Sequence, residues 1–233
     1  MGRAPLLRRA EQKTAIRPVP LCNGVVTSPD RRSVLRAAAA IAAGAAATAC
    51  TRSGAAPAAA RATALLREAE RAGARVTVLA VGTWLDEQPA MARRVLDGGH
   101  ELGNHTLHHR TICALPEDEA YAEITGCADR LRALTGTIGS WFRPSRTQYA
   151  TDQVIRLARR AGYPHVLSYD LDSLDADDPG APAVQRTVLD GARPGSVVSL
   201  HLGHPGTVAA LPPILDGLHR RGLRAVTTTE LVT

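Results

Sequence analysis

Short apolar runs alternate with amphipathic helical segments from Ala62 to the C-terminus, and this alternation constrains the fold more than any other feature of the sequence. Each strand followed by a helix returns the chain to the same end of a sheet, so repeated units build a mainly parallel sheet covered by helices. Helices are predicted at 62–72, 89–97, 116–135, 151–161, 182–190 and 211–221, and strands at 75–81, 101–104, 141–143, 165–169, 196–201 and 224–227. The pattern predicts an α/β domain and does not by itself separate a barrel from an open sheet.

The formal net charge of +6 comes from the beginning of the chain. The sequence has 28 Lys and Arg against 22 Asp and Glu, and residues 1–49 contain eight of the basic but two of the acidic residues. The remainder is therefore neutral overall, which argues against a basic surface for nucleic acid. The length of 233 residues corresponds to one domain once a targeting segment is subtracted.

Residues 1–50 are predicted to be an export signal. Arg31 and Arg32 precede a weakly apolar, Ala-rich run at 37–49, which is the order found in twin-arginine signals. That run is too short and too mildly apolar to anchor the chain across a bilayer. We therefore expect an exported protein, located outside the cell or in its envelope.

The end of this segment allows two kinds of processing. Ala47-Thr48-Ala49-Cys50 fits a lipobox, in which Cys50 becomes the lipidated first residue, and it fits a plain Ala-x-Ala cleavage site equally well. A lipid on Cys50 would be the protein's one contact with a membrane. Residues 51–61 are predicted to be a linker and residues 62–233 the folded domain.

Two cysteines, Cys113 and Cys127, remain in the domain. An even number of cysteines in an exported chain is compatible with a disulfide, and two separate buried thiols are the alternative. A Cys113–Cys127 disulfide is the hypothesis. A bridge requires Cα atoms less than about 7 Å apart.

The histidines at 105 and 109 suggest a metal site. The spacing of four residues would place both imidazoles on one face of a helical turn, where they could hold a single metal ion. The segment 98–104 before them is predicted to run through a turn into a strand, so the pair follows a strand end, as sites in α/β folds often do. A solvated His-rich loop is the alternative for such a pair.

Residues 99–109, Gly-His-Glu-Leu-Gly-Asn-His-Thr-Leu-His-His, resemble the metal-binding motif of the polysaccharide deacetylases, the NodB-homology domain of carbohydrate esterase family 4. Residues 74–82 and 89–97 resemble the strand and helix that precede it in that family, and the resemblance extends from Ala62 to the C-terminus. It implies an irregular (β/α) barrel in which His105 and His109 are zinc ligands.

Three further motifs are similar to those of the family, and each follows a predicted strand. In Trp141-Phe142-Arg143-Pro144 the resemblance gives Arg143 the role of pairing with the catalytic aspartate. In Tyr169–Asp175 it makes Asp175 the carboxylate that orients the catalytic histidine. In Ser196–His201 it makes His201 the general acid that protonates the departing amine. The family's aromatic and Leu positions are here Arg146, Ala176 and Ser199.

His204 and the acids Asp177 and Asp178 are predicted to lie in solvated loops.

The first strand of the family, which ends in Thr-Phe-Asp-Asp, has no counterpart in the sequence. In the family one Asp is the general base and the other is the third zinc ligand. Residues 51–61 stand at the corresponding place and contain no acidic residue and no strand pattern. Either the chain has lost this part of the site or the sequence lacks a segment, and the first strand of the barrel would be absent in both cases.

These features predict a deacetylase-type hydrolase of non-peptide C–N bonds that acts on N-acetylated polysaccharide or oligosaccharide. His201, Asp175 and Arg143 are the predicted catalytic residues, and a divalent metal, zinc in the first place, would bind weakly at the incomplete His105 and His109 site. The alternative is a catalytically impaired, carbohydrate-binding relative of the same fold. We expect a monomer that binds no nucleic acid.

Overall fold

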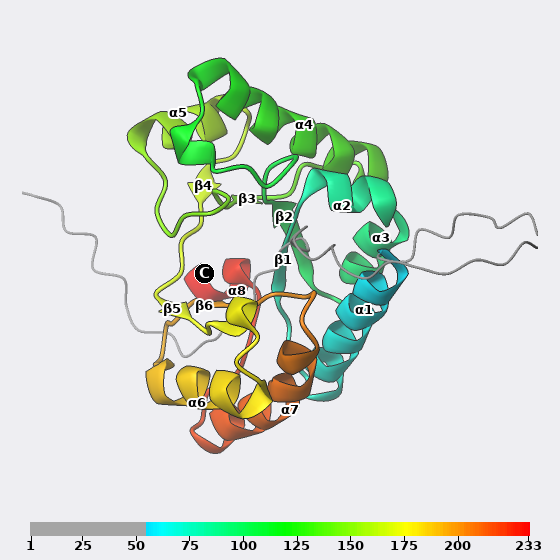
Figure 1. Cartoon of the computed structure of the whole chain (residues 1–233), viewed down its shortest axis with the longest axis vertical. Coiled ribbons are helices and arrows are strands. Elements are labelled where there is room, and N and C mark those ends of the chain that lie inside the picture. The colour runs from blue at the N-terminus through cyan, green and yellow to red at the C-terminus, as the bar shows by residue number, and fades with distance from the viewer. Residues whose placement is uncertain (1–54) are drawn as a thin grey trace, which may run out of the picture.

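The computed structural model describes residues 55–233, so the predicted signal segment and its twin arginines lie outside the described residues. Helices form the outer layer and the strands lie inside it, as Figure 1 shows. The chain order is α1 (Ala55–Arg71), β1 (Thr77–Ala80), α2 (Gly82–Glu87), α3 (Ala90–Asp97), β2 (Glu101–Asn104), α4 (Glu117–Thr135), β3 (Trp141–Phe142), α5 (Asp152–Arg160), β4 (His165–Val166), β5 (Leu171–Asp172), α6 (Ala181–Gly191), β6 (Val198–Ser199), α7 (Pro205–Arg220) and α8 (Thr228–Val232), with 3-10 turns at Ile112–Ala114 and Asp175–Asp177.

The strands form two parallel sheets, in agreement with the predicted α/β class. One has the order β1-β2-β3-β4, and the other pairs β5 with β6. In the larger sheet Thr77 pairs with Glu101, and Trp141 pairs with His165. Sequential parallel pairing of this kind places all the carboxyl ends of the strands at one rim, which is where sites occur in such folds.

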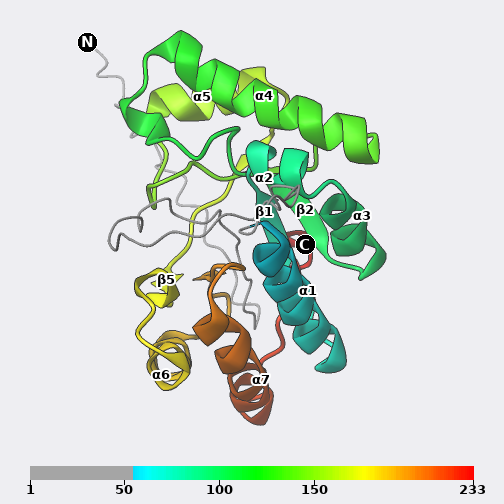
Figure 2. The same cartoon turned by 45° about the vertical axis from the view of Figure 1, so that its right-hand side comes forward.

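β1 is the end strand of its sheet within residues 55–233. Its four residues are nevertheless buried. The C-terminal segment reaches the start of β1, where the Arg75 backbone N–H donates to the Ala225 carbonyl at 3.2 Å and the Thr228 N–H donates to the Thr77 hydroxyl at 2.7 Å. Figure 2 shows α1 lying beside β1 on the outside of the sheet. No described strand pairs with β1 on the side opposite β2.

Alternation along β1 separates two apolar layers. Val78 and Ala80 belong to the main core under the outer helices, whereas Leu79 belongs to a small inner cluster with Trp141 and Leu167. Side chains two residues apart on a strand point to the same face. The inner cluster therefore marks the interior that the two sheets enclose.

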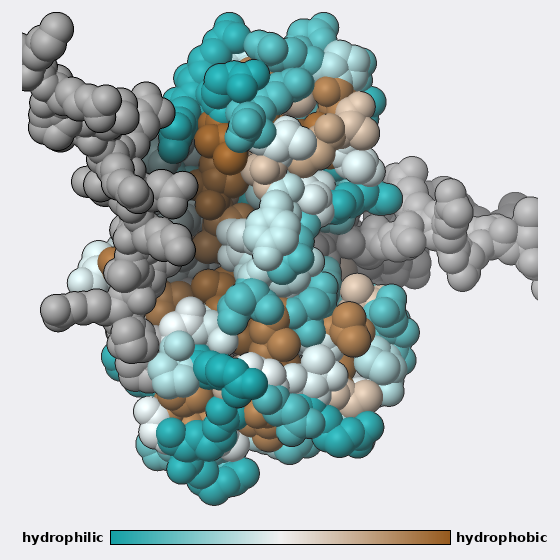
Figure 3. Space-filling view, turned by 90° about the vertical axis from the view of Figure 1, so that its left-hand side faces the viewer, coloured by the Kyte–Doolittle hydropathy of each residue, from teal (hydrophilic) through white to brown (hydrophobic). Residues whose placement is uncertain are grey.

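One face of the molecule shows the same division from outside. In Figure 3 its upper and lower ends are mainly hydrophilic, and hydrophobic residues gather in a band between them. Within residues 55–233 no helix is long and apolar enough to cross a membrane.

Most predicted elements are confirmed. The strand at 101–104 has the predicted bounds, and the helix predicted at 151–161 is α5, with the Thr151 hydroxyl capping it by accepting the Val154 N–H. The predictions did not include α2, β5 or α8. These are short, and periodicity is a weak signal over a few residues.

Three expectations about element bounds were wrong. Residues 55–61, predicted as linker, are the first part of α1, because their alanines favour a helix. Helix α7 begins at Pro205, so Pro212 and Pro213 lie inside it rather than in its first turn. The strand predicted at 224–227 is reduced to a single bridge residue, Ala225, and the chain enters α8 through a capping box at Thr227 and Glu230.

The proposed disulfide is also wrong, since both cysteines are free. Cys127 is buried in α4 and its thiol donates to the Ala80 carbonyl at 3.3 Å. Cys113 lies in the 3-10 turn before α4. A helix rises about 1.5 Å per residue, so Cys127 lies more than two turns along α4 from the end that Cys113 approaches.

Candidate functional site

His105 and His109 lie close together at the carboxyl end of β2. Their ring centroids are 4.9 Å apart, and His105 is almost fully buried. The segment is a loop and not the helical turn that the spacing suggested, because Thr106 and His109 have φ of 70° and 57°. The left-handed backbone conformations of Thr106 and His109, and not a helical turn, bring the two imidazole rings together.

Side chains from neighbouring elements hold this loop. The Asn104 side-chain oxygen accepts the Thr106 N–H at 2.8 Å, while its amide donates to the Ile124 carbonyl and to the Tyr163 hydroxyl. The buried carboxylate of Glu123 accepts the His108 N–H at 2.8 Å and contacts the His108 ring at the same distance. These fixed contacts pre-organise the loop. Sequence reasoning missed Glu123, because it lies among several acids on a helix.

The environment keeps both imidazoles neutral. Burial lowers the pKa of His105 well below its usual value, and the nearby Arg143 charge lowers it further. Burial likewise lowers the pKa of His109 to about 4, with Arg146 the next cause. The His105 Nδ1 lies 2.9 Å from the Arg143 carbonyl oxygen, so Nδ1 carries the proton and Nε2 keeps its lone pair. A neutral imidazole with one oriented nitrogen is the form that binds metals.

His201 and Asp175 form the second part of the site, after β6 and β5. The His201 Nδ1 lies 2.6 Å from Asp175 Oδ1, and the His201 backbone N–H donates to Oδ2 at 2.7 Å. The hydroxyls of Ser173 and Thr207 also donate to this carboxylate, at 2.9 Å and 2.6 Å. Burial acts to raise the pKa of Asp175, but these hydrogen bonds outweigh it and the pKa lies below its usual value.

The His201 charge lowers the pKa of both His105 and His109, which places the two parts of the site near each other. The ring of His204 also lies near His201, with the centroids 5.9 Å apart, and its Nδ1 is 2.7 Å from Asp178. This second pair was predicted only as solvated loop, and the Asp178 side chain is indeed largely exposed.

Arg143 follows β3 and is buried, with 6% of its surface exposed. Its Nε and Nη1 have no hydrogen-bond partner, and its Cζ lies 4.6 Å from the centre of the Tyr169 ring. Burial lowers the pKa of Arg143, while Tyr169 and Asp172 act in the opposite direction. The guanidinium that was expected to pair with a catalytic aspartate thus has no direct carboxylate partner among the described residues.

The described residues do not complete a catalytic metal centre. Within residues 55–233 no group of three or more His, Cys, Asp and Glu side chains is arranged to hold a metal ion. His105 and His109 fit the requirements of two ligands, but catalytic zinc sites use three protein ligands. The ligand set at His105 and His109 is therefore incomplete within the described residues.

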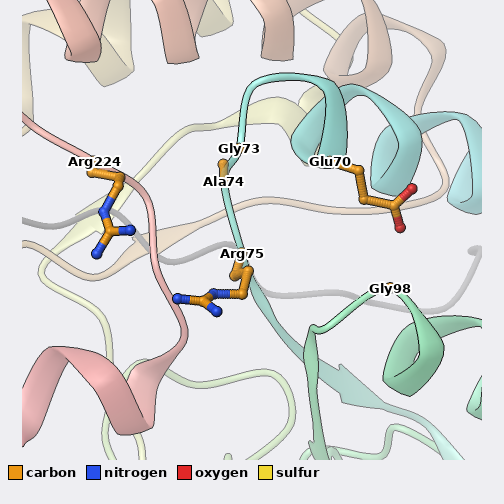
Figure 4. Close-up of a pocket in the computed structure, with 6 residues that line it drawn as sticks. All are labelled: Glu70, Gly73, Ala74, Arg75, Gly98 and Arg224. Carbon is orange, nitrogen blue, oxygen red and sulfur yellow. The ribbon is translucent and has the colours of Figure 1, made fainter.

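A pocket lies at the opposite ends of the strands. Figure 4 shows its lining residues, which come from the end of α1 and from the segments that enter β1, β2 and α8. Arg75 extends toward the side of Arg224, and Glu70 points away from both, toward Arg94, whose Nη1 is 2.6 Å from Glu70 Oε1. This pocket contains none of the predicted site residues.

Comparison with known proteins agrees with the motifs. A family model described as polysaccharide deacetylase matches residues 54–166. The chain is 33% identical over 165 residues to a peptidoglycan-N-acetylglucosamine deacetylase of Bacillus cereus, covering 68% of this chain and 76% of that protein. It is 29% identical over 162 residues to a chitooligosaccharide deacetylase of a Bradyrhizobium species, covering 63% of this chain and 73% of that protein.

Solved structures show the same fold. A carbohydrate esterase family 4 pseudoenzyme from Bacillus anthracis superposes with a TM-score of 0.75 at 19% identity, over 92% of this chain and 66% of that one. The peptidoglycan deacetylase PdaC from Bacillus subtilis gives 0.72 at 19% identity, over 91% and 90%. The similarity in sequence to the curated deacetylases, together with this fold, shows that the chain belongs to the polysaccharide deacetylase family.

Proposed function

We propose that this protein is a hydrolase that removes N-acetyl groups from an N-acetylated glycan of the cell wall or a similar polymer. The observation that carries the proposal is the His201–Asp175 pair, held at the same rim as the neutral His105 and His109. The curated relatives that support the substrate class are deacetylases of peptidoglycan and of chitooligosaccharides.

His201 acts as the general acid. Asp175 holds the Nδ1 proton and the backbone N–H of His201, so the ring has one orientation and Nε2 is left for the substrate. The ionised Asp175 stabilises the charged imidazolium, whose Nε2 gives its proton to the nitrogen of the breaking C–N bond. The amine then leaves as a neutral group.

Members of this family are generally metal-dependent. His105 and His109 are the two residues of this chain that would hold a divalent ion, and we propose zinc as that ion. Because the described residues supply no third ligand, we expect weak binding, and the role of His201 described above does not depend on the metal.

A catalytically impaired, glycan-binding protein is the second candidate. The unpaired Arg143 and the incomplete ligand set favour it, since both are places where a family member would present a carboxylate. One structural neighbour is itself a pseudoenzyme, which supports the idea that this fold persists without activity.

Acetate release from N-acetylglucosamine oligomers, measured with and without added zinc or cobalt, separates the two candidates. Slow release that His105→Ala abolishes supports the hydrolase. Binding of the oligomers without any release supports the impaired relative. Robust turnover that depends on metal would show that another carboxylate completes the site.

We further propose that the protein is exported, is either cleaved or lipidated near Cys50, and acts as a monomer. The Arg31-Arg32 pair and the Ala-rich run after it support export. Mass spectrometry of protein from the native host should show a mature chain that begins near Cys50, and a cytoplasmic species with Met1 intact would contradict export.

A further inference from the structure

The buried charge of Arg143 needs a counter-charge. Arginine remains protonated in proteins, so a buried guanidinium cannot become neutral as a lysine can. An unpaired buried cation carries a large desolvation cost. Two of its three nitrogens have no hydrogen-bond partner, and its Cζ lies 4.6 Å from the centre of the Tyr169 ring. A nearby anion must therefore offset the charge.

Strand alternation places Arg143 and Tyr169 in one interior layer. Trp141 and Leu167 belong to the inner apolar cluster with Leu79. Arg143 and Tyr169 each follow one of these residues by two positions, and side chains two residues apart share a face of the sheet. Since the Arg143 N–H still pairs with the Asn104 carbonyl at 2.9 Å, the strand geometry continues to this residue.

The same reasoning places Asp172 in that layer from the other sheet. On β5, Leu171 packs outward against Gly191 of α6, where a side chain on the glycine would clash with it. Its neighbour Asp172 therefore points to the opposite face, toward the interior. Asp172 pairs in register with Ser199, which is buried and precedes His201 by two residues.

Asp172 differs from Asp170 in the hydrogen bonds that its carboxylate makes. The Asp170 carboxylate is used by the Ser196 hydroxyl at 2.8 Å and the Val197 N–H at 2.5 Å. Asp172 Oδ1 accepts the local Leu174 N–H, at 3.0 Å. Burial raises the pKa of Tyr169, Asp172 raises it further, and Arg143 lowers it, which is the pattern of a phenol located between an anion and a cation.

We propose that Asp172 is the counter-charge of Arg143, acting through the Tyr169 hydroxyl, and that Asp172 and Tyr169 are positioning residues for the Arg143 guanidinium. They take the place of a direct carboxylate partner, which the described residues lack. The positive charge of Arg143 is then offset by residues of the chain itself. The positioning role in catalysis rests on the proposed function, whereas the interior arrangement does not.

Ultraviolet titration of the tyrosine phenols tests the arrangement in the full chain. The difference between the wild type and Tyr169→Phe isolates the signal of Tyr169. Asp172→Asn should increase the acid dissociation constant of Tyr169 by about tenfold, because the negative neighbour is lost. Asp170→Asn, the matched control, should leave it unchanged. An unchanged Tyr169 titration in Asp172→Asn would overturn the proposal.

Two further variants complete the test. If Asp172→Asn does not fold, Arg143→Gln provides the opposite shift, since Tyr169 loses its cation and should become a weaker acid, and no shift there overturns the proposal. Asp172→Glu should restore both the titration and the rate of acetate release that Asp172→Asn lowers. If the wild type releases no acetate, the proposed function fails, and the Tyr169 titration alone decides the interior arrangement.

Discussion

The two sides of the site are completed to different degrees. On one side, Asp175 accepts hydrogen bonds from His201, Ser173 and Thr207, and little of its hydrogen-bonding capacity is left unused. On the other side, His105 and His109 have no third ligand among residues 55–233, and Arg143 has two unpartnered nitrogens.

This difference separates two chemical tasks. Protonating a leaving amine needs only an oriented imidazole, and the His201 side supplies it. Catalytic zinc sites use three protein ligands, and within residues 55–233 the His105 side supplies two. If the proposed function holds, residues 55–233 supply the general acid with its carboxylate but only two metal ligands, which predicts slow chemistry rather than a different chemistry.

The largest effect is expected at His201. His201→Asn should lower acetate release by about 10²- to 10⁴-fold, because the amine would have to leave without a proton donor. Initial rates on N-acetylglucosamine oligomers measure this. His219→Asn, an exposed histidine on α7, is the control and should retain the rate. Equal rates for all three proteins would show that the complete side of the site is not the catalytic one.

Asp175 should matter for stability as well. Asp175→Asn should lower the free energy of unfolding by about 3 kcal/mol at neutral pH, since it removes a buried carboxylate that accepts four hydrogen bonds. Because the pKa of Asp175 is lowered in the fold, its contribution is complete above its unfolded pKa of about 3.9 and is lost as pH falls through the folded value. Urea unfolding of the wild type and of Asp175→Asn measures this. The difference between their free energies of unfolding should be smaller at acid pH than at neutral pH.

The exposed pair of His204 and Asp178 gives the matched control for this experiment. Asp178→Asn should change stability by less than about 1 kcal/mol, because an exposed ion pair is well solvated. If both substitutions destabilise the protein equally, the burial of Asp175 does not distinguish the two His–Asp pairs, and the contrast between the two sides of the site weakens.

The sequence predicted which strands the site residues follow better than it predicted the geometry of the loop at His105. Arg143, Asp175 and His201 each follow a strand of the structure, and the carboxyl ends of parallel strands share a rim, although β5 before Asp175 was not predicted. The helical turn predicted at His105 was wrong because Asn104 and Glu123 hold the loop through side chains. Spacing along the chain carries no information about such contacts.

The sequence also did not predict the interior layer that contains Arg143, Tyr169 and Asp172. β5 has two residues, and no periodicity can be recognised in so short a strand. Asp172 lies within this strand and pairs with Ser199 of β6, whereas Asp170 precedes the strand and its carboxylate binds Ser196 and Val197. Likewise, Thr207 and Ser173 reach Asp175 only because α7 and the turn after β5 pack together, which depends on the tertiary fold.

The smallest effect is expected from metal. Two neutral imidazoles should bind zinc weakly, so a moderate zinc concentration should raise the unfolding free energy by less than about 1 kcal/mol, following the logarithmic dependence on concentration over Kd. Thermal unfolding with and without zinc measures it.

His105→Ala should remove the effect, and His219→Ala should not. The Arg143 carbonyl orients His105, whereas His109 is partly exposed. Replacing His105 should therefore reduce the stabilisation by zinc more than replacing His109. A large zinc stabilisation that needs both histidines would mean that a third ligand joins them, and the contrast between the two sides of the site would disappear.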